Sequence, residues 1–232
     1  MVSLVSMRFA CALFVVGLFA ACEDPAPETG IAESAPAPDS SDRPDRSDLP
    51  KIVAFGDSLT AGFGIGQDEA YPAVLQELLD AAGYHFEVIN AGVSGDTSAG
   101  GVRRIDWVLE DRDVAVLILE LGANDGLRGL PPSEMKKNLS AILDVAEARG
   151  IPVLLAGLSV GETPADRYLR EFVGVYDELA RERDVRFLPQ FLDNVAGVKS
   201  LNQSDGKHPN TEGARVVAQN VFEALGPMLD QP

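Results

Sequence analysis

Near-continuous apolar runs alternate with segments of helical periodicity along most of this chain, and this alternation limits the possible folds more than any other feature. The apolar runs lie at Lys51–Phe55, Phe86–Ala91, Val114–Leu121, Pro152–Ala156 and Val185–Leu188. Such runs are typical of strands that are covered on both faces. The helical segments are roughly Tyr71–Ala82, Ala99–Leu109, Pro132–Arg149, Ala165–Arg183 and Thr211–Leu229. Strands and helices in alternation predict a parallel sheet between two helix layers.

Composition divides the rest of the chain into two further parts. Residues 1–22 contain an apolar run after Arg8, which is too short for a membrane span of about 20 residues but suits a bacterial export signal. Residues 23–48 contain eight acidic residues, five prolines and one large aliphatic residue, Ile31. This segment cannot bury enough apolar surface to fold, so we expect a disordered acidic linker. The remaining residues, 49–232, are long enough for one core, and we expect one domain there.

The apolar run of the signal ends in Leu18-Phe19-Ala20-Ala21-Cys22, which resembles the lipobox of bacterial lipoproteins. In a lipobox, cleavage leaves the cysteine as the lipidated first residue. The resemblance therefore implies an exported lipoprotein, periplasmic or at the cell surface, anchored to the membrane through Cys22. Otherwise Cys22 would be a solitary oxidisable thiol, because Cys11 lies inside the signal. An ordinary secretory signal that ends near a cysteine is the alternative.

The charge of the chain argues against one class of partner. Nineteen basic residues stand against 36 acidic ones, which gives a net charge of −17. Phosphate backbones are normally bound by clusters of Lys and Arg. We therefore expect no nucleic-acid partner, and we expect the protein to be a monomer.

Short polar clusters follow the first three apolar runs, and a fourth precedes the last helical segment. They read Gly56-Asp57-Ser58-Leu59-Thr60, Gly92-Val93-Ser94-Gly95-Asp96-Thr97, Gly122-Ala123-Asn124-Asp125-Gly126 and Ser204-Asp205-Gly206-Lys207-His208-Pro209-Asn210. Because the carboxyl ends of parallel strands meet at one edge of a sheet, the first three clusters should lie together there.

In their order, and over essentially all of residues 51–229, the four clusters resemble the four sequence blocks of the SGNH hydrolases, also called GDSL esterases and lipases. Three stretches are similar to the bacterial thioesterase I, lysophospholipase L1 and arylesterase group, namely 92–100, 121–129 and 205–210. The resemblance implies a flavodoxin-like three-layer α/β/α sandwich with about five parallel strands in the order 2-1-3-4-5. It also implies a serine ester hydrolase with a covalent acyl-enzyme and no cofactor.

The resemblance makes Ser58 the nucleophile, and a serine hydroxyl needs a neighbouring base. The chain has two histidines. His85 stands where a helix ends and a strand begins, at the edge of the sheet opposite the clusters. His208 instead follows Asp205 by three residues, and Pro209 disfavours helical geometry at His208. We therefore expect His208 to be the base and Asp205 to orient it.

Acyl transfer also needs hydrogen-bond donors for the developing oxyanion. By resemblance these are the backbone N–H groups of Ser58 and Gly95 and the side-chain amide of Asn124. The neighbouring polar residues are expected to support these loops rather than to react, namely Asp57, Asp96, Thr97 and Asp125.

Two other chemistries are possible for these residues. Carboxylates with one imidazole can bind a metal, as in a metal-dependent phosphoesterase, with candidate ligands Asp57, Asp96, Asn124, Asp205 and His208. A single candidate histidine and the lack of a His-rich motif argue against this, and we expect no metal. The same fold can also carry a non-catalytic binding module.

Apolar residues near the clusters are candidates for an acyl groove, namely Leu59, Phe63, Leu127, Leu130 and Val160. In the thioesterase relatives a Leu-Pro pair after the fourth strand is linked to acyl-chain fit. This chain has Ser159-Val160-Gly161-Glu162-Thr163-Pro164 there, which argues against long-chain acyl-CoA. We expect aryl esters, short or medium acyl esters or lysophospholipids as substrates, with acetylated carbohydrate as the alternative.

Overall fold

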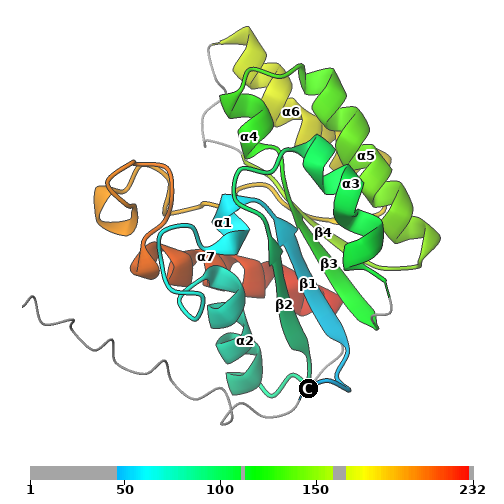
Figure 1. Ribbon diagram of the computed structural model, residues 1–232, viewed down its shortest axis with the longest axis vertical. Coiled ribbons are helices and arrows are strands. Elements are labelled where there is room, and N and C mark those ends of the chain that lie inside the picture. The colour runs from blue at the N-terminus through cyan, green and yellow to red at the C-terminus, as the bar shows by residue number, and fades with distance from the viewer. Residues whose placement is uncertain (1–45, 111–112, 159–165, 230–232) are drawn as a thin grey trace, which may run out of the picture. The chain divides into compact units, whose positions relative to one another are not determined.

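The centre of the domain is one sheet of five parallel strands (Figure 1). The computed structural model describes residues 46–110, 113–158 and 166–229. The strands are β1 (Lys51–Gly56), β2 (Glu87–Gly92), β3 (Val114–Glu120), β4 (Val153–Ala156) and β5 (Arg186–Leu188). Their order, β2-β1-β3-β4-β5, confirms the predicted α/β fold and strand order.

Helices cover both faces of the sheet, as Figure 1 shows. The longer ones are α2 (Tyr71–Ala81), α3 (Ser98–Val108), α5 (Pro132–Ala148), α6 (Arg167–Glu182) and α7 (Thr211–Leu225). Apolar side chains of α3, α5 and α6 pack on one face of the sheet, and those of α2 and α7 pack on the other. Alternate residues of β1 enter the two cores, as the strand period requires: Val53 and Phe55 enter the first, Ile52 and Ala54 the second. All six residues of β1 are buried.

Three details of the helices differ from the expectations drawn from the sequence. Two short helices, α1 (Ser58–Ala61) and α4 (Ala123–Leu127), form inside polar clusters, where no helical periodicity is long enough to detect. The last helix ends at Leu225, and the predicted continuation to Leu229 is mostly the 3-10 helix η3 (Gly226–Met228). Pro227 lacks the backbone N–H that an α-helix would use, which favours this change.

The register of the strands brings the ends of β1, β2 and β3 together. Gly56 lies beside Gly92 of β2 on one side and beside Glu120 of β3 on the other. The polar clusters after these strands therefore start at one edge of the sheet, as parallel strands require.

The described part of the chain begins at Arg46, whose guanidinium pairs with Asp80 at 2.6 Å. The expected export signal (1–22) and the linker up to residue 45 lie outside the described residues. Within the described ranges, the helices are too short or too polar to cross a bilayer.

Candidate active site

Ser58 lies in a tight turn between a buried strand and a short helix. It is the first residue of α1, and the carboxylate of Asp57 accepts the backbone N–H of Leu59 at 3.0 Å, which caps this helix. A side chain at Gly56 would collide with Thr60 and with Glu120. Glycine is thus required for the chain to pass this point, and the turn leaves the Ser58 hydroxyl half-buried at the strand end.

The imidazole of His208 connects this serine to a carboxylate. His208 Nε2 lies 3.0 Å from Ser58 Oγ, and His208 Nδ1 lies 2.6 Å from Asp205 Oδ2. Asp205 Oδ1 accepts the backbone N–H groups of Lys207 at 2.9 Å and of His208 at 3.1 Å. The hydrogen bond to His208, followed by these two, holds the pKa of Asp205 well below its usual range. The carboxylate is therefore ionised wherever the protein is folded at ordinary pH.

The loop that carries His208 is held to the Ser58 side by Gln203. Its side-chain amide donates to the backbone oxygen of Phe63 at 2.6 Å and to that of Pro209 at 2.9 Å. The ring of Phe63 packs on the His208 ring with 4.7 Å between centroids. Gln203 is not predicted from the sequence, because a single amide in a polar loop carries no distinctive pattern.

Asn124 lies between the loops that follow β1 and β2. Its side-chain amide donates to Asp57 Oδ2 at 3.0 Å and to the backbone oxygen of Asp96 at 2.9 Å. Asp96 follows Gly95, which has a φ of 81° and an exposed backbone. The amide therefore lies next to residues adjoining both Ser58 and Gly95, the other two predicted oxyanion donors. Ser58 contributes the N–H of a first helical residue, which has no partner within the helix.

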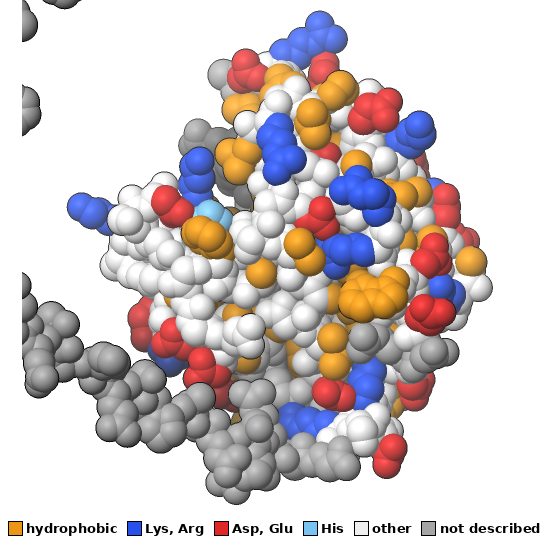
Figure 2. All heavy atoms as spheres, in the orientation of Figure 1, with side chains coloured by type: hydrophobic (Ala, Val, Ile, Leu, Met, Phe, Trp, Pro, Cys, Tyr) orange, Lys and Arg blue, Asp and Glu red, His pale blue; other side chains and the backbone are white. Residues whose placement is uncertain are grey.

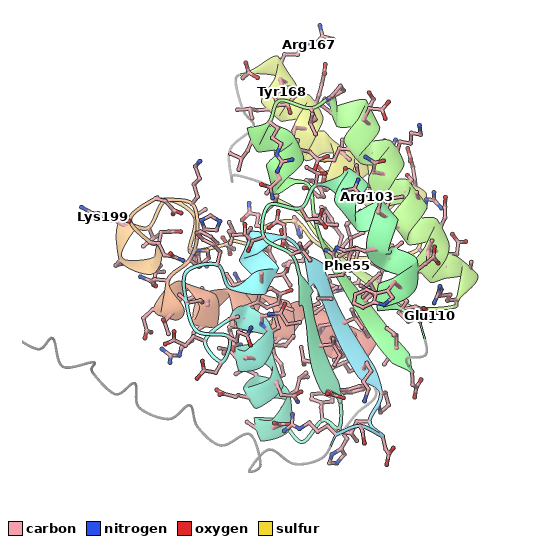
Figure 3. All side chains as sticks on the ribbon, in the orientation of Figure 1. Phe55, Arg103, Glu110, Arg167, Tyr168 and Lys199 are labelled. Atoms are coloured by element: carbon pink, nitrogen blue, oxygen red, sulfur yellow. The ribbon has the colours of Figure 1, made fainter. Side chains whose placement is uncertain are left out.

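The other polar residues of the clusters hold the loops in place. Asp125 is buried and accepts the backbone N–H of Ser98 at 2.8 Å and its hydroxyl at 2.6 Å. Thr97 caps α3. The segment after β3 is tied to α6 by Tyr168, which Figure 3 labels. The Tyr168 hydroxyl donates to the backbone oxygen of Leu130 at 2.8 Å.

A buried carboxyl group beneath Ser58 was not anticipated from the sequence. Glu120 is fully buried at the end of β3, and its Oε2 accepts the Thr60 hydroxyl at 2.8 Å and the Asp57 N–H at 3.3 Å. Its Oε1 has no hydrogen-bond partner among the described residues. Burial, and then the charge of Asp57, raise the pKa of Glu120 well above its usual range. The sequence signal that could have indicated this group is a single glutamate at the end of an otherwise apolar strand.

Burial also raises the pKa of Asp57, to about 6. Hydrogen bonds from the Leu59 N–H and the Asn124 amide oppose this shift by favouring the ionised form. Asp57, with a pKa of about 6, is therefore mostly ionised at neutral pH, whereas burial and the charge of Asp57 favour the neutral form of Glu120.

Apolar side chains lie beside Ser58 and at the surface around it. A small cavity that Ser58 and His208 help to line is otherwise lined mostly by apolar residues, among them Leu59, Phe63 and Ile65. Leu127 at the end of α4 and Leu130 just after it are exposed, whereas Val160 lies outside the described residues. In Figure 2, surface apolar side chains are scattered among charged ones rather than gathered in one continuous patch.

His85 is exposed and lies just before β2, away from the carboxyl edge of the sheet. In the described ranges, no three His, Cys, Asp or Glu side chains are gathered in a way that could hold a metal ion.

Comparison with known proteins places this arrangement in a family. Residues 54–216 match the model of the GDSL-like Lipase/Acylhydrolase family. The chain belongs to this family. It is 37% identical to the esterase TesA of Pseudomonas aeruginosa over 77% of this chain and 89% of that protein. It is 33% identical to the thioesterase 1/protease 1/lysophospholipase L1 of Escherichia coli K12, over 77% of this chain and 85% of that one.

Solved structures of similar proteins support the same family. The crystal structure of TesA superposes with a TM-score of 0.73 at 37% identity and covers 77% of this chain and 99% of that one. AlinE4, an SGNH-hydrolase family esterase, superposes with a TM-score of 0.65 at 42% identity, over 79% of this chain and 98% of that one. These relatives confirm the predicted family, and the chain is a carboxylic ester hydrolase.

Proposed function

We propose that Ser58, His208 and Asp205 form the catalytic triad of a serine esterase. The observation that carries this proposal is the pair of contacts of the His208 ring, 3.0 Å to Ser58 Oγ and 2.6 Å to Asp205 Oδ2. These contacts give His208 an acceptor nitrogen for the serine proton and a carboxylate to stabilise the imidazolium that forms. Asp205 keeps its charge throughout.

In the first half-reaction Ser58 Oγ attacks the acyl carbon while its proton passes to His208 Nε2. The backbone N–H groups of Ser58 and Gly95 and the amide of Asn124 stabilise the oxyanion. Asn124 now donates to two protein oxygens, so the oxyanion replaces one of them. His208 then protonates the leaving alcohol or thiol, the ester bond breaks, and an acyl-Ser58 remains.

In the second half-reaction water attacks the acyl-Ser58. His208 takes a proton from this water, the same three donors stabilise the second oxyanion, and His208 returns the proton to Ser58 as the carboxylic acid leaves. No cofactor is required for either step.

The test uses p-nitrophenyl acetate as substrate and an organophosphonate as a covalent label. Ser58→Ala and His208→Ala should lower kcat by about 10⁴–10⁶-fold, and the label should modify Ser58. His85→Ala is the matched control, because His85 is the second histidine and is exposed. Substantial activity in Ser58→Ala, or a label on another residue, would contradict the serine mechanism.

We propose aryl esters, short or medium acyl esters and lysophospholipids as the substrate classes. The apolar residues beside Ser58 support this, as do relatives named arylesterase in Vibrio mimicus and lysophospholipase L1 in E. coli. A panel of p-nitrophenyl esters of increasing chain length, a lysophospholipid and an acetylated xylan distinguishes these classes. The highest kcat/KM on the acetylated carbohydrate would instead indicate a carbohydrate acetylesterase.

We also propose that the protein is exported and anchored to a membrane through a lipid on Cys22. The export signal and the lipobox resemblance at Leu18–Cys22 support this. Mass spectrometry of the mature N-terminus should find a diacylglycerol on Cys22, and Cys22→Ala should abolish this modification. An unmodified N-terminus elsewhere would reject the anchor.

A further inference from the structure

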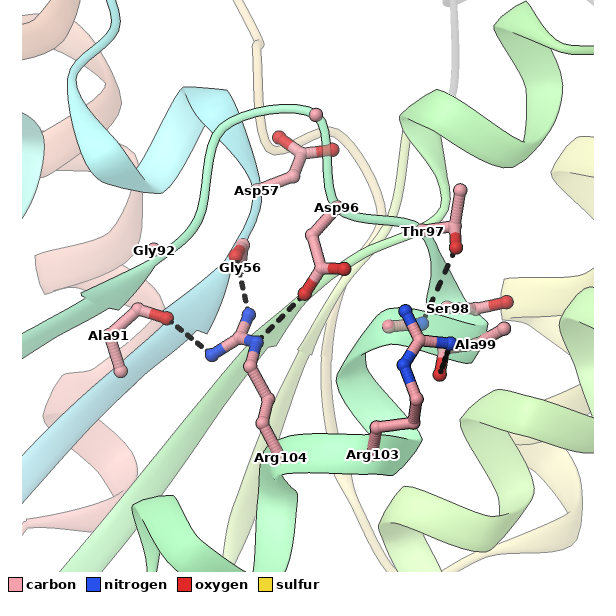
Figure 4. A network of polar contacts seen from close by, with 12 residues as sticks. Gly56, Asp57, Ala91, Gly92, Asp96, Thr97, Ser98, Ala99, Arg103 and Arg104 are labelled. Atoms are coloured by element: carbon pink, nitrogen blue, oxygen red, sulfur yellow. Dashed lines mark hydrogen bonds and ion pairs between the residues drawn. The ribbon is translucent and has the colours of Figure 1, made fainter.

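A largely buried guanidinium joins the loops that carry the proposed oxyanion donors. Arg104 projects from α3, and its side chain is 16% exposed. It donates from Nε to Asp96 Oδ2 at 2.8 Å, from Nη1 to the Ala91 oxygen at 2.7 Å and from Nη2 to the Gly56 oxygen at 2.8 Å (Figure 4). Its Cζ lies 3.9 Å from the centroid of the Phe55 ring. One planar group thus contacts two strand ends and the loop after β2.

Two of these contacts are next to groups that the reaction uses. Gly56 is two residues before Ser58, and Asp96 directly follows Gly95. The backbone oxygen of Asp96 in turn accepts the amide of Asn124 at 2.9 Å. A shift of Arg104 would therefore displace residues next to all three proposed oxyanion donors, although Arg104 itself bonds to none of the donors.

The chemistry of these contacts suits arginine rather than lysine. The guanidinium presents rigid donors in one plane, which matches three acceptors in fixed directions, whereas an ammonium is a compact point charge on a flexible stem. Asp96 balances the charge, which a buried cation requires. A side chain at Gly100 would collide with the Asp96 carboxylate, so α3 leaves room for this ion pair.

We propose that Arg104 is a positioning residue for the oxyanion hole, one that fixes the Gly95 loop relative to the Ser58 turn. The inference rests on the proposed acyl transfer at Ser58. Oxyanion donors act mainly in the transition state, so their misplacement should lower kcat and leave KM nearly unchanged. A residue that only supported the fold would instead change the free energy of unfolding.

The test compares Arg104→Ala and Arg104→Lys with Arg103→Ala in the full chain. Arg103 is the matched control, because it is the preceding residue of the same helix but is exposed and donates to the backbone of its own helix, at Ala99 (Figure 4). Loss of a whole oxyanion donor costs about 10²–10³-fold. We expect a smaller loss in kcat on p-nitrophenyl acetate, about 10–100-fold, for both Arg104 variants and none for Arg103→Ala.

Chemical rescue separates positioning from folding. Guanidinium chloride, at concentrations far below those that unfold the protein, should restore kcat of Arg104→Ala several-fold by binding in the vacated space. Urea is the control for rescue, since it is planar but uncharged. Arg104→Lys, which keeps the charge, should gain nothing from guanidinium. The rate of phosphonate labelling of Ser58 should fall and recover in parallel with kcat.

The inference is wrong if both Arg104 variants keep kcat within about twofold of the wild type, or if they lose it only in proportion to the unfolded fraction. It is also wrong if the loss lies in KM or if urea rescues as well as guanidinium does. Should Arg104→Ala not fold, the kcat and labelling rate of Arg104→Lys decide. These outcomes are separate from the proposed function, which fails instead if Ser58→Ala stays active.

Discussion

The turn that carries Ser58 and the loop that carries His208 meet at one hydrogen bond, yet they are held in place by different forces. Around Ser58 the polar groups are buried: Asp57, Thr60 and Glu120 have no exposed surface. Around His208 they are open to solvent, and the Asp205 side chain is 39% exposed. Buried contacts at the ends of β1 and β3 therefore fix the nucleophile, whereas hydrogen bonds of an exposed loop, together with the Phe63 ring, hold the base.

The carboxyl groups of the two regions respond in opposite directions. Burial raises the pKa of Asp57 to about 6 and that of Glu120 well above its usual range. Hydrogen bonds from His208 and from two backbone N–H groups lower the pKa of Asp205. A carboxylate must stay charged beside an imidazolium, whereas burial beneath Ser58 favours the neutral form of a carboxyl group. We therefore expect substitutions in the His208 loop to change activity alone, and substitutions around the Ser58 turn to change both stability and activity.

Among the variants that compare the two regions, Asp205→Asn should have the largest effect. The asparagine amide favours the wrong tautomer of His208, and kcat should fall by about 10³–10⁴-fold. Because the loop is exposed, the urea midpoint should stay near that of the wild type. Steady-state kinetics and urea unfolding at neutral pH check both parts. Lys207→Ala is the control within the same loop. If Asp205→Asn lost stability as well as kcat, the contrast between the two regions would not hold.

The next effect is expected from Glu120→Ala. It leaves the Thr60 hydroxyl and the Asp57 N–H without their buried acceptor and opens a cavity, which should lower the free energy of unfolding by about 2–4 kcal/mol. A looser Ser58 turn should lower kcat by roughly tenfold. Urea unfolding and kinetics on p-nitrophenyl acetate measure these changes.

Glu120→Gln is the matched control, because it keeps a neutral acceptor for both donors. Its kcat should stay within about threefold of the wild type if Glu120 acts as a neutral acid. An equal loss in the Ala and Gln variants would show that the negative charge matters instead.

The pH dependence of stability should reveal the same buried acid. In the wild type the folded state holds the Asp57 proton to about pH 6, against 3.8 for the ordinary group, and holds the Glu120 proton above its ordinary 4.5. The folded state thus binds more protons than the unfolded state, and the free energy of unfolding falls as the pH rises through this range.

Glu120→Gln removes one of the two groups. Its free energy of unfolding should match the wild type near pH 4 and exceed it increasingly as the pH rises toward 8. Urea titrations across this range measure the difference. A constant offset between the two proteins would mean that Glu120 does not keep a raised pKa.

The sequence predicted the sheet well, because each strand is marked by a run of consecutive apolar residues. The five apolar runs correspond to the five strands, and the strand order follows from the family resemblance. The polar clusters begin at one edge because parallel strands must end there. The same reasoning placed Ser58 and Asn124 at that edge, without defining which atoms contact each other.

Glu120 and Arg104 escaped prediction because their partners are distant in the chain. The contact between Glu120 and the Ser58 turn depends on the register that sets Gly56 beside it. Arg104 has acceptors 8, 13 and 48 residues away, and no spacing rule connects them. Polar contacts between residues distant in the chain depend on how the helices and strands pack, and this packing cannot be read from a single sequence.

The smallest effect is expected from Gln203→Ala, which tests whether hydrogen bonds alone position the base. The variant removes two hydrogen bonds, to the backbone oxygens of Phe63 and Pro209. Each such bond contributes a net stabilisation of about 0.5–1.5 kcal/mol. Because the His208 loop has little packing to replace them, kcat should fall about threefold to tenfold with a small change in the urea midpoint. Gln219→Ala, on the exposed face of α7, is the control. Unchanged kcat would mean that the Phe63 ring and the Asp205 contacts suffice to hold His208.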